Sequence, residues 1–324
     1  MADTVHIAFA VDSGYFKQAS VTMASIAANA AHPERLRFHV IHAEEPAWVE
    51  ARMRYFKAWN VSFVKAENPF LMADLGGSHV SAVAMMKTQL PELLLDLDSV
   101  IYVDADVVFT HDIEKLWNCE ISDCGIAGVI DFGIYKNISR QIYKEEFKYR
   151  DYLISQGLDP GKMIYVNSGI LYMNLAKLRA SGFSAKARGM NSSYVGKRYF
   201  VDQDIINILV NGSVVVLDPR WNVLANTVSR SGRRRHHYIP AHARHDLDLQ
   251  LSQQWAIHYA GPSKPWKDGS VWGAELWWKY AKLGGLDWPT VGMRPLTINQ
   301  MLMEYMLDFR SVLSKFAYNW KTRS

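Results

Sequence analysis

Two aspartates near the end of an apolar run are the residues of this chain that point most directly to chemistry. The run from Val100 to Phe109 is rich in β-branched residues, which is typical of a buried strand, and Asp104 and Asp106 interrupt it near its end. At strand spacing, residues i and i+2 point the same way, so the two carboxylates can face one object. The spacing therefore allows both to bind a single ligand, although a solvated strand end is the plainer alternative.

A divalent cation is the ligand that this pair suits best. Two unpaired carboxylates beside an apolar strand repel each other and resist burial. A hard cation removes both costs, and a cation held by only two protein carboxylates still has sites for diphosphate oxygens. The pair thus indicates a metal-assisted nucleotide-sugar site.

Apolar runs earlier in the chain predict the sheet that would position this pair. Runs typical of strands, over residues 5–11, 36–41 and 61–64, alternate with helical patterns, which predicts parallel strands joined by right-handed crossovers. Ligands of such sheets bind outside the carboxyl ends of the strands. Asp12 directly follows the first run, so it and the aspartate pair are expected at the same edge of the sheet.

The middle of the chain adds further expected elements and one basic segment. The expected elements are helices over 46–59, 85–95 and 202–209, strands over 125–130 and 165–174, and an extended segment over 214–218. Residues 230–240 are polar and basic without apolar periodicity, which favours a mobile loop. The arginine cluster within it is either a solvated surface or an acceptor-side loop that binds a phosphorylated or carboxylated glycolipid.

Composition is ordinary for a globular protein and excludes several classes. The 324 residues are 49% hydrophobic and 21% charged, enough for one large α/β domain or two smaller ones. A net charge of +4 is too weak to indicate nucleic acid as a partner. Only two cysteines occur, no signal peptide is evident, and no apolar segment approaches a membrane-spanning length. A cytoplasmic location is therefore expected.

The end of the chain has a different pattern, typical of an amphipathic helix. Its apolar residues recur at helical spacing, and they are Ile298, Met301, Leu302, Tyr305, Phe309, Val312, Leu313 and Phe316. Basic residues and Trp320 follow the stripe. The helix either covers the core or lies at a membrane surface, on the inner face of the cytoplasmic membrane. We expect a catalytic domain over residues 1–285 and a helical tail over 286–324.

Five separated segments, taken together and in order, resemble glycosyltransferase family 8. They are Phe9 to Asp12, Tyr102 to Asp106, Val166 to Leu175, Asp202 to Asn207, and His258 to Trp266. This family comprises retaining enzymes that include bacterial lipopolysaccharide galactosyl- and glucosyltransferases. The resemblance runs from about residue 5 to about residue 280. It implies a GT-A fold, a Rossmann-like α/β domain that binds nucleotide-diphospho-sugars, here followed by the amphipathic C-terminal helix.

The resemblance also implies the donor and the metal. It implies transfer of glucose or galactose from UDP-glucose or UDP-galactose to a glycan or glycolipid acceptor, such as lipopolysaccharide core or another surface polysaccharide. The metal is Mn²⁺, with Mg²⁺ as a substitute, held by Asp104, Asp106 and His258; an imidazole ligand favours Mn²⁺ over Mg²⁺. Lys264 matches the lysine that neutralises the diphosphate, and Gly261 lets the backbone approach it.

Further residues of the donor site follow from the same resemblance. Ala10 and Asp12 match the uracil and ribose contacts, Ala105 lies within the metal motif, and Lys87 stands where family members often have an arginine. Lysine cannot form the same bidentate contacts as arginine, so donor contacts differ there. The residues that match the sugar site are Asp131, Asn167, Asp202 and Gln203.

The catalytic residues implied are Gln203, Asp202 and Lys264. Gln203 matches the residue near the anomeric carbon, and because an amide is a poor nucleophile we favour front-face attack over a covalent glycosyl intermediate. A nucleotidyltransferase would need a glycine-rich phosphate loop after the first strand, which Asp12 to Phe16 does not provide. The remaining alternative is a catalytically silent protein that binds nucleotides or glycans.

Overall fold

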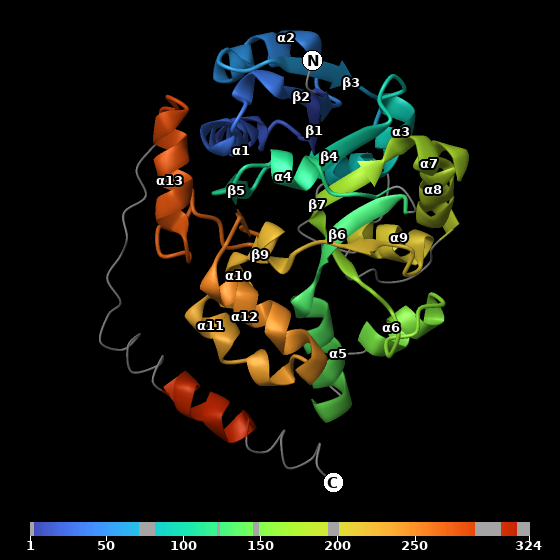
Figure 1. Ribbon diagram of the computed structural model, residues 1–324, viewed down its shortest axis with the longest axis vertical. Coiled ribbons are helices and arrows are strands. Elements are labelled where there is room, and N and C mark those ends of the chain that lie inside the picture. The colour runs from blue at the N-terminus through green and yellow to red at the C-terminus, as the bar shows by residue number, and fades with distance from the viewer. Residues whose placement is uncertain are drawn as a thin grey trace.

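The computed structural model describes residues 3–70, 82–121, 124–144, 149–193, 201–288 and 306–315. A large sheet with helices on both faces forms the upper part of the molecule, and a group of short helices lies below it (Figure 1). Among the described residues, no helix is long and apolar enough to cross a membrane. Most of the predicted C-terminal helix lies outside the described residues, and only 306–315 can be compared with it.

The large sheet is mixed, with strand order β3-β2-β1-β4-β7-β6-β8. Its strands are β1 (Val5–Ala10), β2 (Leu36–His42), β3 (Val61–Lys65), β4 (Ser99–Val103), β6 (Ile126–Ile130), β7 (Val166–Asn174) and β8 (Val215–Val216). The pairs β1–β2, β2–β3 and β1–β4 are parallel, which confirms the pairing predicted from strand–helix alternation. β7 is antiparallel to both of its neighbours, β4 and β6.

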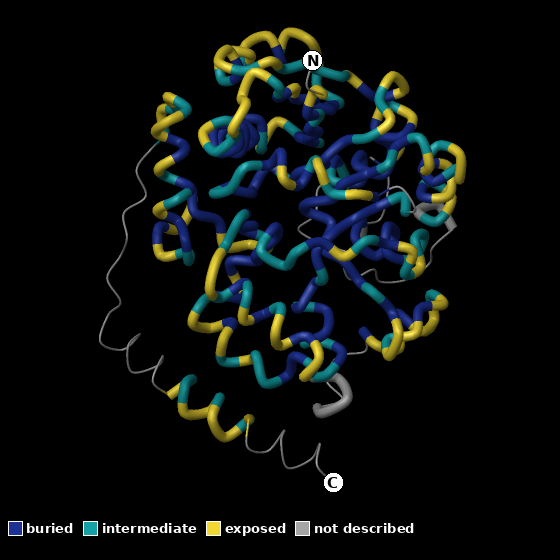
Figure 2. The backbone as a smooth tube through the Cα atoms, in the orientation of Figure 1, coloured by how far each residue is buried: buried dark blue, intermediate teal, exposed yellow. Residues whose placement is uncertain are grey.

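Both faces of the sheet are buried, which explains why its strands are apolar throughout. Alternate residues of β1 belong to different cores: Ile7 packs with α1 (Phe16–Asn29) on one face, and Ala8 packs with Leu90 on the other. The elements on the second face are the 3₁₀ segment η3 (Ala82–Gln89) and the helices α3 (Leu90–Leu93), α7 (Leu175–Ala180), α8 (Phe183–Ser193) and α9 (Val201–Val210). These buried strands form the dark core of the molecule in Figure 2.

The aspartate pair lies between two sheets rather than inside one strand. The predicted strand ends at Val103, and the chain resumes as β5 (Val107–Phe109), which belongs to a small sheet of order β5-β10-β9. In that sheet β10 (Ala256–His258) is antiparallel to β5 and parallel to β9 (Val223–Leu224). Because β10 pairs with β5, the late residue His258 is brought next to the turn that holds the aspartates.

Short helices form the lower part of the molecule. They are α5 (Phe132–Lys144), α6 (Tyr149–Ser155), α10 (Ala225–Val228), α11 (Arg230–Arg233), α12 (Arg244–Ser252) and the 3₁₀ segments η4 (Pro219–Trp221), η5 (His236–Tyr238) and η6 (Ala241–Ala243). The prediction of a mobile loop over 230–240 is therefore wrong. Ser229 accepts a hydrogen bond from the Gly232 amide at the start of α11, and Tyr238 and Ile239 are buried, so caps and burial fix a segment that lacks helical periodicity.

The remaining helices lie around the large sheet. They are α2 (Pro46–Glu50), α4 (Glu114–Trp117), α13 (Ala274–Leu283) and the 3₁₀ segments η1 (Pro33–Arg35) and η2 (Met53–Phe56). The single helix predicted over 46–59 is thus two short ones, α2 and η2. Helix α13 packs beside α1 through the fully buried Trp277 and its aromatic neighbours (Figure 1).

The helix over residues 306–315 contacts the protein through its polar face. Asp308 pairs with Arg230 at 2.5 Å and also with Arg234, and the Ser311 hydroxyl donates to the Arg234 carbonyl at 2.6 Å. Four of its five large apolar side chains are exposed instead, and they are Met306, Phe309, Val312 and Leu313; Leu307 is half-buried. In its described part, this helix does not bury its apolar stripe against the core (Figure 2).

Candidate functional site

The turn that carries the aspartates is fixed by one hydrogen bond to each of three elements. The Asp104 amide donates to the Gly169 carbonyl of β7 at 2.8 Å. The Thr22 hydroxyl of α1 donates to the Ala105 carbonyl at 3.0 Å. The Tyr259 amide, directly after β10, donates to the Asp106 carbonyl at 3.0 Å. The backbone of the turn is thereby held without using either carboxylate.

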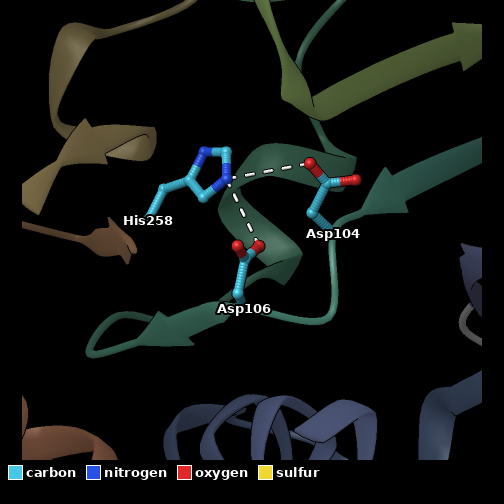
Figure 3. Close-up of side chains that lie close together, drawn as sticks. All are labelled: Asp104, Asp106 and His258. Atoms are coloured by element: carbon cyan, nitrogen blue, oxygen red, sulfur yellow. Dashed lines mark ion pairs between the residues drawn. The ribbon is translucent and has the colours of Figure 1, made fainter. Parts of the chain in front are cut away.

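Both carboxylates face the imidazole of His258 (Figure 3). Its Nε2 lies 3.3 Å from Asp106 Oδ1 and 3.7 Å from Asp104 Oδ2. One ligand atom from each of the three residues lies within 4.8 Å of the others. Two carboxylates and one imidazole, mostly buried and converging on one point, fit a divalent cation that accepts oxygen and nitrogen ligands. The three residues named from the sequence as metal ligands are thus brought together.

Gly169 provides the space that the imidazole occupies. A Cβ atom at this position would lie 2.2 Å from Cε1 of His258, far inside any allowed contact. The glycine of the Asn167–Gly169 segment is therefore required for His258 to face the aspartates.

Lys264 lies against the same carboxylates in the present arrangement. Its ammonium donates to Asp106 Oδ2 and, at 2.8 Å, to the Tyr259 carbonyl. Burial alone would raise the pKa of Asp106, but the adjacent Lys264 and His258 outweigh it and hold this pKa below its ordinary value. Gly261, three residues earlier, has φ +89°, a conformation that favours glycine. A lysine thus sits directly beside the proposed metal position.

A second lysine, Lys87, joins a candidate metal ligand, Asp104, to Asp202, one of the residues expected at the sugar. It is 1% exposed, and its ammonium lies 3.1 Å from Asp104 Oδ1 and 2.7 Å from Asp202 Oδ2. The Tyr102 hydroxyl donates to the same Asp104 oxygen at 2.6 Å. Burial would lower the pKa of Lys87, but Asp104 and Asp202 together raise it, so the side chain stays charged. Lys87 is therefore a buried cation shared by two carboxylates.

The residues expected at the sugar form one hydrogen-bonded group. Asp131 Oδ2 accepts from Asn167 Nδ2 and from Gln203 Nε2, each at 3.0 Å. Gln203 Oε1 accepts from the Ser168 amide at 3.1 Å, and the Ser168 hydroxyl donates to Asp202 at 2.9 Å. Asp202 and Gln203 lie in the first turn of α9, and Asp131 directly follows β6. Polar groups from three elements thus meet in a fixed arrangement.

All of these residues line one cavity of about 860 Å³. The predicted residues in its wall are Ala10, Asp12, Lys87, Asp104, Ala105, Asp106, Asp131, Asn167, Asp202, Gln203, His258, Gly261 and Lys264. Asp12 also accepts a hydrogen bond from the Gly14 amide at 2.9 Å, which shapes the turn after β1. A cavity of this size accommodates a nucleotide-sized ligand.

Several residues of the site were not predicted from the sequence. Tyr15, Asn226, Thr227, Lys136 and Lys267 line the cavity, and Asn222 hydrogen-bonds His258 behind it. Apart from Lys136, which lies in α5, they come from turns and short helical segments, so their place depends on tertiary packing. The prolines and glycines around positions 219 and 261 mark turns, but nothing in their spacing names a ligand.

Comparison with known proteins agrees with this fold. The chain is 28% identical to a crystal structure of the galactosyltransferase LgtC in complex with donor and acceptor sugar analogs, with a TM-score of 0.70 over 89% of this chain and 98% of that one. It is 23% identical to the glycosyltransferase GlyA of Streptococcus pneumoniae over 88% of this chain, and 26% identical to the lipopolysaccharide 1,2-glucosyltransferase of Escherichia coli over 58%. The chain spans 35% of GlyA and 49% of the E. coli enzyme.

A mixed α/β sheet with an aspartate pair at the end of its central strand places this protein among the glycosyltransferases of GT-A fold. Within that class it belongs to the glycosyl transferase family 8, whose profile matches residues 6–270. The resemblance read from five sequence segments is thereby confirmed. The match ends before the helix over 306–315, so the family does not account for that helix.

Proposed function

We propose that this protein transfers glucose or galactose from a UDP-sugar to a glycan or glycolipid acceptor, with retention at the anomeric carbon and with Mn²⁺ as its metal. The observation that carries this proposal is the convergence of Asp104, Asp106 and His258 in the wall of a cavity that Asp131 and Gln203 also line. A diphosphate at the metal end would place its sugar among the hydrogen-bonding groups. The lipopolysaccharide 1,2-glucosyltransferase among its relatives supports a surface glycan as the acceptor.

The donor would be held by its three chemical parts. Ala10 and Asp12 at the end of β1 would contact uracil and ribose, and Ala105 lines the same cavity. Asp104, Asp106 and His258 would hold the cation, which supplies charge neutralisation on the diphosphate. The ammonium group of Lys264 would leave Asp106 and pair with a phosphate oxygen, which would stabilise the departing UDP.

Front-face attack is the mechanism that the contacts of Asp202 and Gln203 favour. Asp202 is paired with the buried Lys87, and both polar atoms of Gln203 are in hydrogen bonds, so neither group is a strong nucleophile. The acceptor hydroxyl would bond to the anomeric carbon as the bond to the phosphate oxygen breaks. Its proton would pass to that oxygen, and the Gln203 carbonyl dipole would stabilise positive charge on the sugar. Attack and departure on one face give retention.

Release of UDP tests the donor and the site together. We expect release from UDP-glucose or UDP-galactose that requires Mn²⁺, is abolished by EDTA, and falls by at least about a hundredfold in Asp104→Asn. Asp98→Asn is the matched control, because that carboxylate is 93% exposed and lies outside the cavity. A β-configured product from an α-configured donor, seen by NMR, would contradict retention. Binding of UDP without turnover on any acceptor would instead favour a silent binding protein.

We also propose that the helix over 306–315 attaches the protein to a membrane surface. Phe309 and Leu313 are 66% and 53% exposed, on a helix whose polar side contacts the protein through Asp308 and Ser311. An exposed apolar face with nearby basic residues is the pattern of an interfacial helix. This orientation would bring the side of the protein that carries Arg230 and Arg234 near a glycolipid.

Co-sedimentation with anionic vesicles tests the attachment. We expect Phe309→Ser/Leu313→Ser to weaken binding by roughly tenfold or more, since each buried side chain contributes about 1.5–3 kcal/mol. The control is Leu95→Ser/Leu283→Ser, two side chains with 66% and 61% exposure on other elements. Equal binding of both variants would refute attachment through this helix.

A further inference from the structure

Asn222 is buried behind the site, on the side of His258 that faces away from the aspartates. Its Oδ1 lies 3.1 Å from Nδ1 of His258, and its Nδ2 donates to Asn167 Oδ1 at 2.9 Å. The residue is 2% exposed. Its side chain thus joins the candidate metal ligand to the group of residues at the sugar end.

The neighbours of Asn167 determine which way each of these side chains is oriented. Asn167 Oδ1 accepts from the Gly169 amide at 3.0 Å, and a backbone amide can only donate. Asn167 Nδ2 therefore faces the Asp131 carboxylate, at 3.0 Å. Asn222 must then present its NH₂ group to Asn167, which leaves its oxygen toward His258. An amide oxygen can only accept, so Nδ1 of His258 must carry the proton.

We propose that Asn222 is a positioning residue for the metal: it holds His258 as the Nδ1–H tautomer, with the lone pair of Nε2 directed at Asp104 and Asp106. A neutral imidazole ligates a cation through its unprotonated nitrogen, and the hydrogen bond of the other nitrogen determines which one that is. Without Asn222, the same ring could turn its Nε2–H toward the carboxylates instead, and such a ring cannot bind a cation there.

The fold holds Asn222 in place independently of the ring. The residue lies between η4 and β9, and β9 pairs with β10 so that Leu224 faces His258 in register. Gln250 of α12 donates to the carbonyls of Pro219, at 2.8 Å, and of Asn222, at 3.4 Å. The backbone of this segment is therefore fixed, and the side chain of Asn222 is rigid enough to orient another group.

The hydrogen bonds also have one direction from the metal end to the sugar end. His258 donates to Asn222, Asn222 donates to Asn167, and Asn167 donates to Asp131, which also accepts from Gln203. The Gly169 amide, which can only donate, and the Asp131 carboxylate, which can only accept, fix this direction. The inference rests on the proposed function to the extent that His258 binds a metal.

Mn²⁺ binding measures the effect of Asn222. Titration of Mn²⁺ alone, followed through the EPR signal of the free ion, should show roughly ten- to a hundredfold weaker binding in Asn222→Ala than in the wild type. Asn222→Asp keeps an acceptor for Nδ1–H and should recover most of the affinity. Gln250→Ala is the matched comparison: it loosens the same segment at an equally buried position but keeps the Asn222 amide, so it should weaken Mn²⁺ binding less than Asn222→Ala does.

The tautomer of His258 can be read separately in the metal-free protein. In ¹⁵N-histidine-labelled protein, the His258 signals, identified by their absence in His258→Gln, should report Nδ1–H in the wild type and in Asn222→Asp, and Nε2–H in Asn222→Ala. A wild-type His258 protonated at Nε2 and not at Nδ1, or an unchanged tautomer and Mn²⁺ affinity in Asn222→Ala, would overturn the proposal. A wild-type protein that binds no Mn²⁺ with or without UDP would refute the proposed metal instead, while the tautomer would still decide the role of Asn222.

Discussion

The cavity described above, here called the cleft, and the flank of the large sheet at β1–β3 both bury ionisable side chains. Those in the cleft are charged, whereas those in the flank are neutral. In the cleft, Lys87 and Lys264 are buried beside Asp104, Asp106 and Asp202, and both lysines remain charged because these carboxylates raise their pKa values against the effect of burial. Charge is retained there because each buried cation faces an anion.

The flank contains three polar side chains in a row, and in the described part of the chain none of them forms an ion pair with a carboxylate. His6 Nδ1 lies 3.0 Å from His39 Nε2, and His39 Nδ1 lies 2.8 Å from the Ser62 hydroxyl. Burial, together with the neighbouring His6 and Arg37, lowers the pKa of His39 to about 4. These rings are therefore neutral at ordinary pH.

The contrast separates groups that serve a ligand from groups that serve the fold. A buried ion pair contributes little net stability, because the cost of desolvating two charges offsets most of their attraction. Charges kept in such a place can be redistributed when a charged ligand enters. A neutral hydrogen-bonded row satisfies its polar atoms and offers nothing to a diphosphate. Three substitutions test whether this separation is real.

The largest effect is expected at Lys87. Lys87→Met fills a similar volume but leaves the buried Asp202 without its cation, which should lower the free energy of unfolding by about 3–5 kcal/mol. Urea unfolding followed by circular dichroism measures the change. Lys87→Arg keeps the positive charge, so its free energy of unfolding should fall by less than that of Lys87→Met. If Lys87→Met lost under about 1 kcal/mol, the buried charges of the cleft would not depend on pairing as described here.

The second effect concerns Lys264, which now shares Asp106 with the proposed metal position. Removing this competing cation in Lys264→Met should strengthen Mn²⁺ binding in the absence of nucleotide by about tenfold, or 1.4 kcal/mol. The same variant should weaken binding of UDP in the presence of Mn²⁺, because the diphosphate loses its counter-charge. EPR titration gives the first value and calorimetry the second. Weaker Mn²⁺ binding without nucleotide would mean that Lys264 does not compete with the metal.

The sequence predicted these two regions unequally, for physical reasons. Asp104 and Asp106 could be placed because carboxylates at the end of an apolar strand are costly without a ligand, and His258 because it matches a family motif. The chain nevertheless turns at the aspartates instead of continuing as one strand, since β5 pairs with β10 in a second sheet. Asn222 had no local signal: its contact with His258 depends on β9 pairing with β10 across 36 residues.

Contacts that are distant in sequence also explain why the basic segment over 230–240 and the charge state of His39 were not predicted. Arg230 and Arg234 were expected in a mobile loop, but both pair with Asp308, about which local composition says nothing. His39 lies in a run that the sequence correctly predicts as a strand, and its alternation cannot tell whether a histidine there is charged. Strand and helix patterns are local, whereas pairing partners and charge states depend on contacts distant in sequence.

The smallest effect is expected at His39, and it tests the neutral side of the comparison. The pKa of about 4 in the folded protein lies below the ordinary 6.5, so the unfolded chain takes up a proton first as the pH falls. This contribution to stability is complete above pH 6.5 and is lost as the pH falls toward 4. Between pH 6.5 and pH 5 the free energy of unfolding should fall by about 1 kcal/mol through His39, after allowance for partial exposure of the ring. Chemical unfolding of wild type and His39→Gln at both pH values measures it. The glutamine can hydrogen-bond both neighbours and cannot titrate, so the free energy of unfolding of His39→Gln should fall by that amount less than the wild type's between the two pH values. An equal fall in both proteins would show that the ring is charged in the fold or that other groups cause the pH dependence.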